Sequence, residues 1–258
     1  MLKIQTKYIL GLSATPTRED GLSSVFEAFI GKPAYWEKIR EPDPGVVVRA
    51  VFYDSPCDDY QEVPVNWKGE PVTAKLLSQI VKWEDRTNTI IKICREICVD
   101  SRRQILMLSE RKEHLEAFER LLDAEPKIKT GYYIGGMKDE VRERNAKEAQ
   151  VLLATYAMAS DALNIKTLNA VILASPRKNV EQSTGRILRL RPDQRQVEPI
   201  IVDIIDSHDM YVRQWYKRKS YYKQCKYTIR NEGVAAPTEK QKKEIKEQAA
   251  PLGGACLF

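Results

Sequence analysis

Short apolar runs alternate with amphipathic stretches through residues 104–205. The apolar runs predict strands at 104–108, 130–134, 150–155, 170–174 and 199–205. Between them, apolar positions recur at helical spacing over residues 112–124, 138–148, 159–163 and 179–190. Strands that are apolar throughout and alternate with helices are typical of a parallel sheet covered on both faces. The pattern therefore predicts an α/β fold.

The residues before this region follow a less regular pattern. The run KYILGL at 7–12 predicts a buried strand that ends at the hydroxyls of Ser13 and Thr15, and a helix is expected at 22–30. A strand at 46–53, an irregular exposed segment at 60–71 and helices at 72–83 and 87–99 follow. Because residues 32–45 are rich in Pro and Gly, they predict a linker. We expect the end of one domain at 1–31, a main domain at 46–230 and a flexible tail at 231–258.

A basic and aromatic segment follows the last of these strands. Between His208 and Arg230 there are seven Lys and Arg residues and a single acid, Asp209. Tyr211, Trp215 and Tyr222 fall on one helical stripe, which predicts a helix that packs through its aromatic face and turns its basic face outward. Stacking of these rings on nucleic-acid bases is the less favoured alternative. A short edge strand is expected at 227–229.

Composition narrows the class of protein. The chain has 258 residues, 43% of them apolar, and a formal net charge of +6, which leans towards a polyanionic partner. Its five cysteines show no zinc-ligand spacing, so no metal site is expected. No run approaches the roughly 20 apolar residues that cross a bilayer, and the N-terminus does not resemble a secretory signal. We therefore expect an intracellular protein without membrane contact.

The helix expected at 179–190 carries the sequence NVEQSTGRILRL. Gln182, Arg186 and Arg189 share one helical face, and Gly185 beside it leaves room for a ligand to approach the backbone. Such a face suits an anion. Taken alone, however, two arginines on a helix are more often a solvated surface than a phosphate site.

The sequence lacks the usual nucleotide cradles. No G-x-G-x-x-G follows any expected strand, and no G-x-x-x-x-G-K-[ST] phosphate loop is present. Gly135 and Gly136 form the sole double glycine before the tail, but Met137 and Lys138 follow without the required spacing. No acidic cluster at an expected strand end is placed to hold magnesium. By itself, the chain is not expected to bind a nucleoside triphosphate.

Five segments, in order, resemble the motifs of superfamily 2 helicases. The segment QSTGRILR at 182–189 matches motif VI, Q-x-x-G-R-x-x-R, at every defined position. Ser13-Ala14-Thr15 resembles motif III, and the segments at 105–118, 132–138 and 152–176 resemble motif IV, the backbone-contacting loop that follows it, and motif V. The segment RED-G, with Arg18, Glu19 and Asp20, is similar to the XPB and UvsW branch of double-stranded DNA translocases, which includes relatives in large DNA viruses.

The resemblance implies a RecA-like C-terminal helicase lobe, preceded by a remnant of the N-terminal lobe. It also implies roles for individual residues. Arg186 and Arg189 would be arginine fingers that reach the γ-phosphate of ATP, with Gln182 beside them. Gly185, Asp161 and Asn164 would complete the nucleotide-facing set. The residues implied to contact nucleic-acid phosphates are Ser109, Arg111, Gly135, Gly136, Lys138 and Thr155, with either Arg142 or Arg144 adding charge, and those implied to couple ATP to nucleic acid are Ser13, Thr15, Arg18, Glu19 and Asp20.

Motif V departs from the family pattern, which ends in Gly-x-Asp. Here Ala162 and Asn164 occupy those two positions, after Asp161. Alanine adopts positive φ less easily than glycine, and an amide lacks the charge-assisted hydrogen bonds of a carboxylate. Either coupling through this motif is weakened or Asp161 takes over part of the role.

We therefore expect the C-terminal lobe of an ATP-dependent DNA helicase or translocase, with ATP and Mg²⁺ held mainly by a missing N-terminal lobe. Alone, the chain is expected not to hydrolyse ATP. The strand at 7–12 would leave an unpaired edge and an exposed apolar face without that partner. Double-stranded or branched DNA, contacted through its backbone, is the expected substrate. Two alternatives remain, an ATP-independent nucleic-acid-binding or regulatory module and the corresponding lobe of an RNA helicase; for Ser109 and Thr155, plain strand-end caps are a further alternative.

Overall fold

The computed structural model describes residues 7–12, 22–35, 42–161, 165–185 and 190–233. The chain divides into two compact units, Met1–Glu41 and Pro42–Phe258. The division falls within the segment at 32–45 that the sequence predicts to be a linker. Each unit is described by itself below.

The larger unit is built on a seven-stranded sheet in which every described pair of strands is parallel. The strand order is β3-β4-β2-β5-β6-β1-β7. The strands are β1 (Val47–Tyr53), β2 (Ile105–Ser109), β3 (Thr130–Tyr133), β4 (Val151–Thr155), β5 (Ala170–Leu173), β6 (Ile200–Asp206) and β7 (Thr228–Gly233). The predicted parallel sheet is therefore confirmed. Its carboxyl edge, where strands β2 to β6 all end, is the place where such sheets bind ligands.

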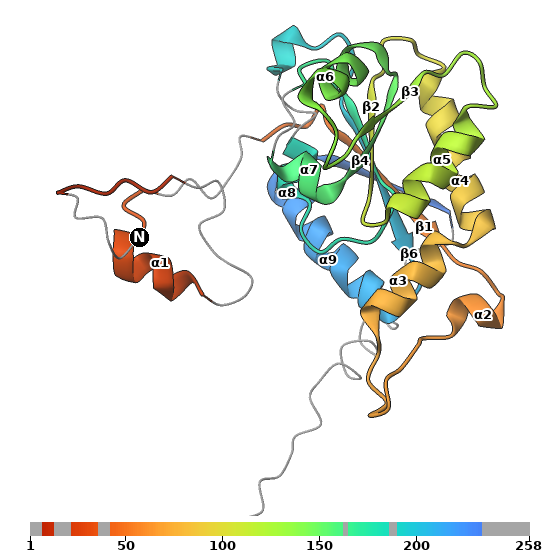
Figure 1. Cartoon of the computed structure of the whole chain (residues 1–258), viewed down its shortest axis with the longest axis horizontal. Coiled ribbons are helices and arrows are strands. Elements are labelled where there is room, and N and C mark those ends of the chain that lie inside the picture. The colour runs from red at the N-terminus through yellow and green to blue at the C-terminus, as the bar shows by residue number, and fades with distance from the viewer. Residues whose placement is uncertain (1–6, 13–21, 36–41, 162–164, 186–189, 234–258) are drawn as a thin grey trace, which may run out of the picture. The chain divides into compact units, whose positions relative to one another are not determined.

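Helices cover both faces of this sheet (Figure 1). They are α2 (Asp58–Gln61), α3 (Thr73–Val81), α4 (Glu84–Cys98), α5 (Lys112–Leu122), α6 (Asp139–Glu148), α7 (Tyr156–Asp161), α8 (Glu181–Gly185) and α9 (Asp209–Gln224). Ile90, Leu115 and Phe118 anchor α4 and α5 in the core on one face. Tyr156 and Trp215 anchor α7 and α9 in the core on the opposite face, and the buried Val180 directly precedes α8. No helix among the described residues is long and apolar enough to cross a membrane.

The strands and helices predicted from residue 46 onward occur close to their expected positions, with two corrections. Helix α7 begins at Tyr156 rather than Ala159, because it follows β4 without an intervening loop. The segment at 60–71 was expected to be exposed, yet Tyr60 lies in α2 and is fully buried. The helix expected at 179–190 is described only as far as Gly185.

Helix α9 packs through its aromatic stripe, as the preferred interpretation of the sequence predicts. Tyr211, Trp215 and Tyr222 are buried, so their rings are not free to stack on nucleic-acid bases. The expectation that every basic side chain of this helix faces outward is wrong for Arg218, which is only 3% exposed. Arg218 turns inward because an acidic partner, Asp203, lies beneath it on β6.

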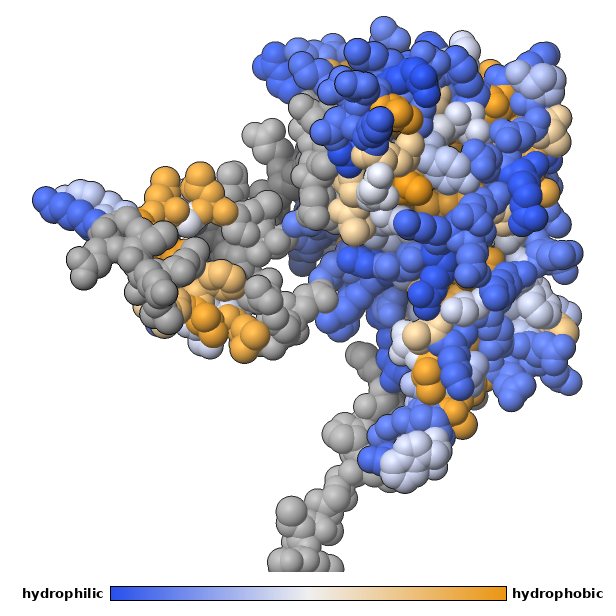
Figure 2. Space-filling model, viewed as in Figure 1, coloured by the Kyte–Doolittle hydropathy of each residue, from blue (hydrophilic) through white to orange (hydrophobic). Residues whose placement is uncertain are grey.

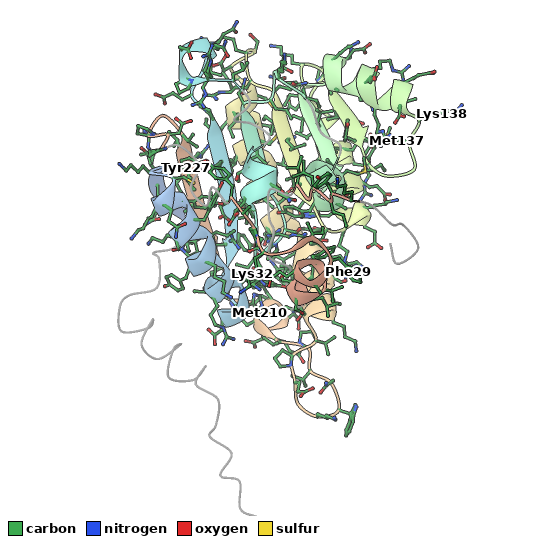
Figure 3. The ribbon with its side chains drawn as sticks, turned by 90° about the vertical axis from the view of Figure 1, so that its left-hand side faces the viewer. Phe29, Lys32, Met137, Lys138, Met210 and Tyr227 are labelled. Carbon is green, nitrogen blue, oxygen red and sulfur yellow. The ribbon has the colours of Figure 1, made fainter. Side chains whose placement is uncertain are left out.

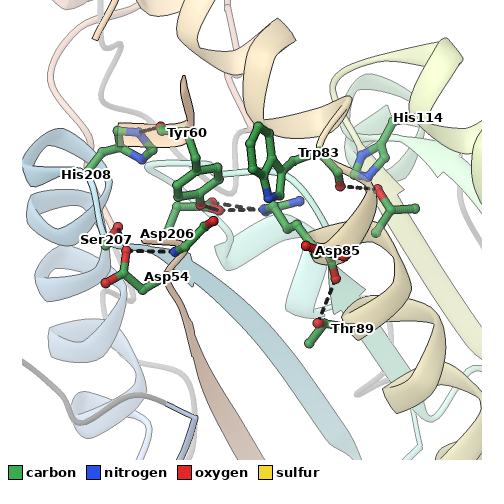
Figure 4. Close-up of polar contacts among 12 residues, drawn as sticks. Asp54, Tyr60, Trp83, Asp85, Thr89, His114, Asp206, Ser207 and His208 are labelled. Atoms are coloured by element: carbon green, nitrogen blue, oxygen red, sulfur yellow. Dashed lines mark hydrogen bonds and ion pairs between the residues drawn. The ribbon is translucent and has the colours of Figure 1, made fainter. Parts of the chain in front are cut away.

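Strand β6 carries a buried ion pair on each of its faces. On one face, Asp203 accepts hydrogen bonds from Arg218 Nε and Nη2, each at 2.8 Å, and from the Tyr222 hydroxyl at 3.0 Å. On the other face, Asp206 accepts hydrogen bonds from Arg86 Nε at 2.5 Å, from Arg86 Nη2 at 3.0 Å and from the Tyr60 hydroxyl at 2.8 Å (Figure 4). A carboxylate inside an apolar strand needs such partners, because an isolated buried charge is very costly. The two pairs thus fix helices from both layers to one central strand.

The smaller unit exposes an unusual amount of apolar surface. Helix α1 (Ser23–Ile30) forms where the sequence predicts a helix, and none of its residues is buried. Residues 8–12 carry no strand, so the prediction of a strand there is wrong; a strand needs a neighbour to accept and donate its backbone hydrogen bonds. Side chains such as Leu10 and Phe26 are exposed, and Figure 2 shows apolar atoms gathered on this unit. The predicted exposed apolar face is therefore present.

Candidate nucleic-acid interface and ATP-facing helix

Three of the segments that resemble helicase motifs meet at the carboxyl edge of the sheet. Strand β2 lies beside β4, with Ser109 directly opposite Thr155. Strand β3 lies on the other side of β4, with Tyr133 opposite Ala154. The loops after these three strands therefore lie next to one another. A Cβ atom at Gly135 would lie 3.8 Å from the sulfur of Met158 in α7, so the loop after β3 contacts the helix after β4.

In the described part of the chain, this edge presents open backbone and the exposed cation Lys138. Gly135, Gly136 and Lys138 are exposed, and Thr155 is half-buried. Gly136 has φ +86°, a conformation that favours glycine, and no atom lies within 4 Å of the position of a Cβ atom there. Figure 3 shows Lys138 at the start of α6, pointing away from the sheet. A phosphate can approach the main chain of this loop without a steric obstacle.

Ser109 does not take part in this open surface. Its side chain is fully buried. The Oγ atom lies 3.1 Å from Nδ1 of His114 and accepts a hydrogen bond from the backbone N–H of Arg111 at 3.2 Å. The expectation that its hydroxyl contacts a phosphate is not supported, because both partners hold it inside the protein. The alternative of a strand-end cap describes Ser109 well.

The burial of His114 predicts a dependence of stability on pH. Burial lowers the pKa of His114 well below its ordinary value, and the nearby Arg86 guanidinium lowers it further. As pH falls below about 6.5, His114 becomes protonated in the unfolded chain but stays neutral in the folded chain. The free energy of unfolding should therefore fall by at most about 1.4 kcal/mol per pH unit. Urea titrations between about pH 7.5 and about pH 5.5 measure this slope. His114→Asn should flatten it; an unchanged slope would assign the titration to another group.

Arg111 is partly committed to the structure. Its Nη2 atom donates a hydrogen bond of 3.2 Å to the carbonyl oxygen of Ala74 in α3. Its Nε atom is buried and has no partner among the described residues. Arg111 therefore connects the loop after β2 to α3 while it keeps unused hydrogen-bonding capacity.

A polar network that sequence reasoning missed connects the loops after β2 and β5 with the start of α7, which directly follows β4. The backbone N–H of Glu110 donates to Ser175 Oγ at 2.9 Å, and Glu110 forms an ion pair with Arg177. The hydroxyl of Tyr156 donates to the carbonyl oxygen of Ser175 at 2.7 Å, and the Arg177 guanidinium lies 5.2 Å from the centre of the Tyr156 ring. No periodicity in the sequence could reveal these contacts, because they depend on β5 lying beside β2.

This polar network continues towards the helix that resembles motif VI. Arg218 Nη1 donates a hydrogen bond of 2.5 Å to the carbonyl oxygen of Arg177, just before α8. In α8, Ser183 and Thr184 are buried and Gln182 is exposed, so the polar face predicted from the sequence points outward as far as it is described. Of the residues that the sequence analysis singled out, nine lie outside the described part of the chain: Ser13, Thr15, Arg18, Glu19, Asp20, Ala162, Asn164, Arg186 and Arg189. Asp161 ends α7.

Comparisons with known proteins identify the origin of this arrangement. Residues 88–191 match the family model of the helicase conserved C-terminal domain. The chain is 30% identical, over 94% of its length, to a putative ATP-dependent RNA helicase of Acanthamoeba polyphaga mimivirus. The chain carries the C-terminal domain of a superfamily 2 helicase. A second relative, a putative ATP-dependent RNA helicase of African swine fever virus, is 27% identical over 88% of the chain.

The chain spans about half the length of these two relatives, 47% in each case. Among solved structures, that of T4 UvsW matches 74% of the chain and 42% of its own with a TM-score of 0.56 at 18% identity. This likeness shows the fold, a RecA-like C-terminal lobe, and confirms the fold class predicted from the sequence. The helicase assignment and the viral relatives agree with the resemblance found in the sequence.

Proposed function

We propose that this chain acts as the C-terminal lobe of an ATP-dependent helicase or translocase. Gln182, Arg186 and Arg189 face the phosphates of ATP, and Mg²⁺ is held mainly by a second, N-terminal lobe. A planar and permanently charged guanidinium suits phosphate oxygens whose charge is redistributed during hydrolysis. The outward polar face of α8 and the complete motif VI in the sequence support this role. Gly185, Asp161 and Asn164 belong to the same nucleotide-facing set.

The register of β3, β4 and β2 is the observation that carries the nucleic-acid half of the proposal. It brings Thr155, the open glycine loop and Lys138 to one edge of the sheet. These groups contact phosphates, with Arg111 beside them, and Ser109 supports them from inside. Because such contacts read the backbone, binding is expected to show little sequence preference and a strong dependence on salt.

DNA is the proposed substrate, on the basis of the segment with Arg18, Glu19 and Asp20 that resembles the double-stranded DNA translocases. RNA is the second candidate, because both viral relatives are named as putative RNA helicases. Ser13 and Thr15 are proposed to couple the ATP state to this substrate. Competition between DNA and RNA oligonucleotides of equal length for the chain decides between the two.

An ATPase assay tests the two-lobe proposal directly. The chain alone should show no turnover with or without DNA, because the sequence contains no phosphate loop. Mixing it with a polypeptide that carries the N-terminal lobe should restore hydrolysis that nucleic acid stimulates. Substantial turnover by the chain alone would contradict the proposal. DNA affinity that does not change when the N-terminal lobe and ATP are added would favour an ATP-independent binding module.

Lys138 offers a direct test of the carboxyl edge. Lys138→Ala should weaken binding about equally for all DNA sequences and reduce the slope of log affinity against log salt by roughly 1, because one phosphate contact is lost. Fluorescence anisotropy at several salt concentrations measures both quantities. Lys127→Ala is the matched control, since Lys127 is exposed before the start of β3 and distant from the carboxyl edge. Equal effects of the two changes would mean that only net charge matters.

A further inference from the structure

A tight turn between α2 and α3 is fixed by its own hydrogen bonds. Asn66 Oδ1 accepts hydrogen bonds from the backbone N–H groups of Lys68 at 2.8 Å and Glu70 at 3.0 Å. The N–H of Asn66 donates to the carbonyl oxygen of Glu70, and the N–H of Gly69 donates to that of Asn66, each at 2.9 Å. Gly69 has φ +78°, which the turn requires and glycine provides. The turn is therefore a defined structure rather than a loose loop.

The base of this turn is tied to the body of the domain. Val65 and Pro71 form a β-bridge, and the N–H of Val72 donates to the carbonyl oxygen of Pro64 at 2.7 Å. The Gln79 side chain of α3 donates to the carbonyl oxygen of Glu62 at 3.0 Å. The turn and α3 therefore move as one piece.

Trp67 stands at the tip of this turn and is 89% exposed. The Nζ atom of Lys68 lies 4.8 Å from the centre of its ring. Val63 and Val65 add exposed apolar surface below it. A large ring held on a fixed backbone loses little conformational entropy when it binds, so it is well suited to a contact with another molecule.

The turn is linked to the proposed nucleic-acid path through helix α3. It follows the carboxyl end of β1, at the same edge of the sheet as Thr155 and the glycine loop. Helix α3, to which the turn is tied, accepts the hydrogen bond from Arg111 of the loop after β2. Ala74 lies in the first turn of α3, which directly follows the turn that carries Trp67.

The charges around the turn offer little to a phosphate, so a nucleic-acid contact here would be made by the base. Asp58, Asp59 and Glu62 lie at its base and repel phosphates, and Glu70 is engaged by the Asn66 amide at 2.9 Å. Lys68 is the only basic residue between Cys57 and Pro71. Each nucleobase has a flat face that stacks on an aromatic ring without any charge requirement.

We propose that Trp67 is a stacking platform for a base of single-stranded nucleic acid beside the loop after β2. The inference rests on the proposed function, since it requires nucleic acid at the carboxyl edge. Lys68 supports the stack with its charge over the same ring. The contact differs from the phosphate contacts because it depends on the base and hardly on salt.

Binding of labelled single-stranded oligothymidine to the whole chain tests this inference, with Trp67→Ala and Trp67→Phe as variants. Trp67→Ala should weaken binding roughly 5- to 100-fold, whereas Trp67→Phe should retain most of the affinity. The ratio between wild type and Trp67→Ala should stay nearly constant as salt increases. An oligonucleotide without bases should bind wild type and Trp67→Ala equally well.

The outcomes separate this inference from the proposed function. If the wild-type chain binds no oligonucleotide, the proposed function fails and the inference fails with it. If the wild type binds and Trp67→Ala binds equally well, the stacking platform is wrong while the proposed function stands. Because Trp67 is so exposed, the variants are expected to melt at the wild-type temperature, which a thermal scan checks.

Discussion

Replacing Asp206 by alanine is expected to lower the free energy of unfolding by about 3 to 5 kcal/mol. The carboxylate is fully buried, as is its partner Arg86, and it accepts both arginine hydrogen bonds and that of the Tyr60 hydroxyl. Removing it leaves a guanidinium charge inside the domain without a counterion. A loss of this size is a large part of the stability of a typical domain.

Chemical denaturation in urea measures this loss, and two further variants interpret it. Replacing the pair together, as Arg86→Met with Asp206→Leu, should cost much less than Asp206→Ala, because no uncompensated charge remains. Asp100→Ala is the matched control: Asp100 forms its ion pair with Arg102 at the surface, where such pairs contribute little. If Asp206→Ala unfolds at the same urea concentration as Asp100→Ala, the buried pair does not stabilise the fold.

The buried ion pair on the other face of β6, between Arg218 and Asp203, is connected to the proposed site. Arg218 holds Asp203 and also donates to the carbonyl oxygen of Arg177, which leads into α8. The ion pair of Arg177 with Glu110 then reaches the loop after β2. The buried pair under α9 therefore stabilises the segment that joins the proposed nucleic-acid edge to the proposed ATP-facing helix.

The layered sheet could be predicted from the sequence because its strands are apolar on both faces and are separated by helical periodicity. The two aspartates within the sequence IIVDIID of β6 were also a usable signal. Charged side chains in a buried strand demand partners. The identity of these partners could not be inferred from the sequence. Arg86 is distant in sequence from Asp206, and Arg218 lies on a helix on which other basic side chains, such as Arg213 and Lys217, are exposed.

The proposed site was predictable as a set of segments but not residue by residue. The motifs indicated which loops matter, and the parallel register brings those loops together. Burial decides which side chain of a loop faces outward, and it places Ser109 inside against His114. The ion pair between Glu110 and Arg177 could not be predicted from the sequence, because it depends on the order of strands in the sheet.

Replacing Arg189 by alanine is expected to reduce ATP hydrolysis by the two reconstituted lobes by about 10³-fold or more, while nucleic-acid affinity stays within about twofold of wild type. An arginine finger stabilises charge that develops on the transferred phosphoryl group, so its loss affects the chemical step rather than the grip on the strand. Single-turnover hydrolysis and fluorescence anisotropy measure the two quantities separately.

Arg191→Ala is the matched control for this experiment. Arg191 is exposed two residues further along the chain, 3.9 Å from Asp193, and lies outside motif VI. Arg191 carries the same charge as Arg189 but is not expected to face the nucleotide. Its loss should therefore leave hydrolysis unchanged. A large loss of nucleic-acid affinity in Arg189→Ala, with hydrolysis retained at saturating nucleic acid, would instead mean that Arg189 binds the strand. The polar face predicted from the sequence for residues 179–190 would then belong to the nucleic-acid interface rather than to the nucleotide site.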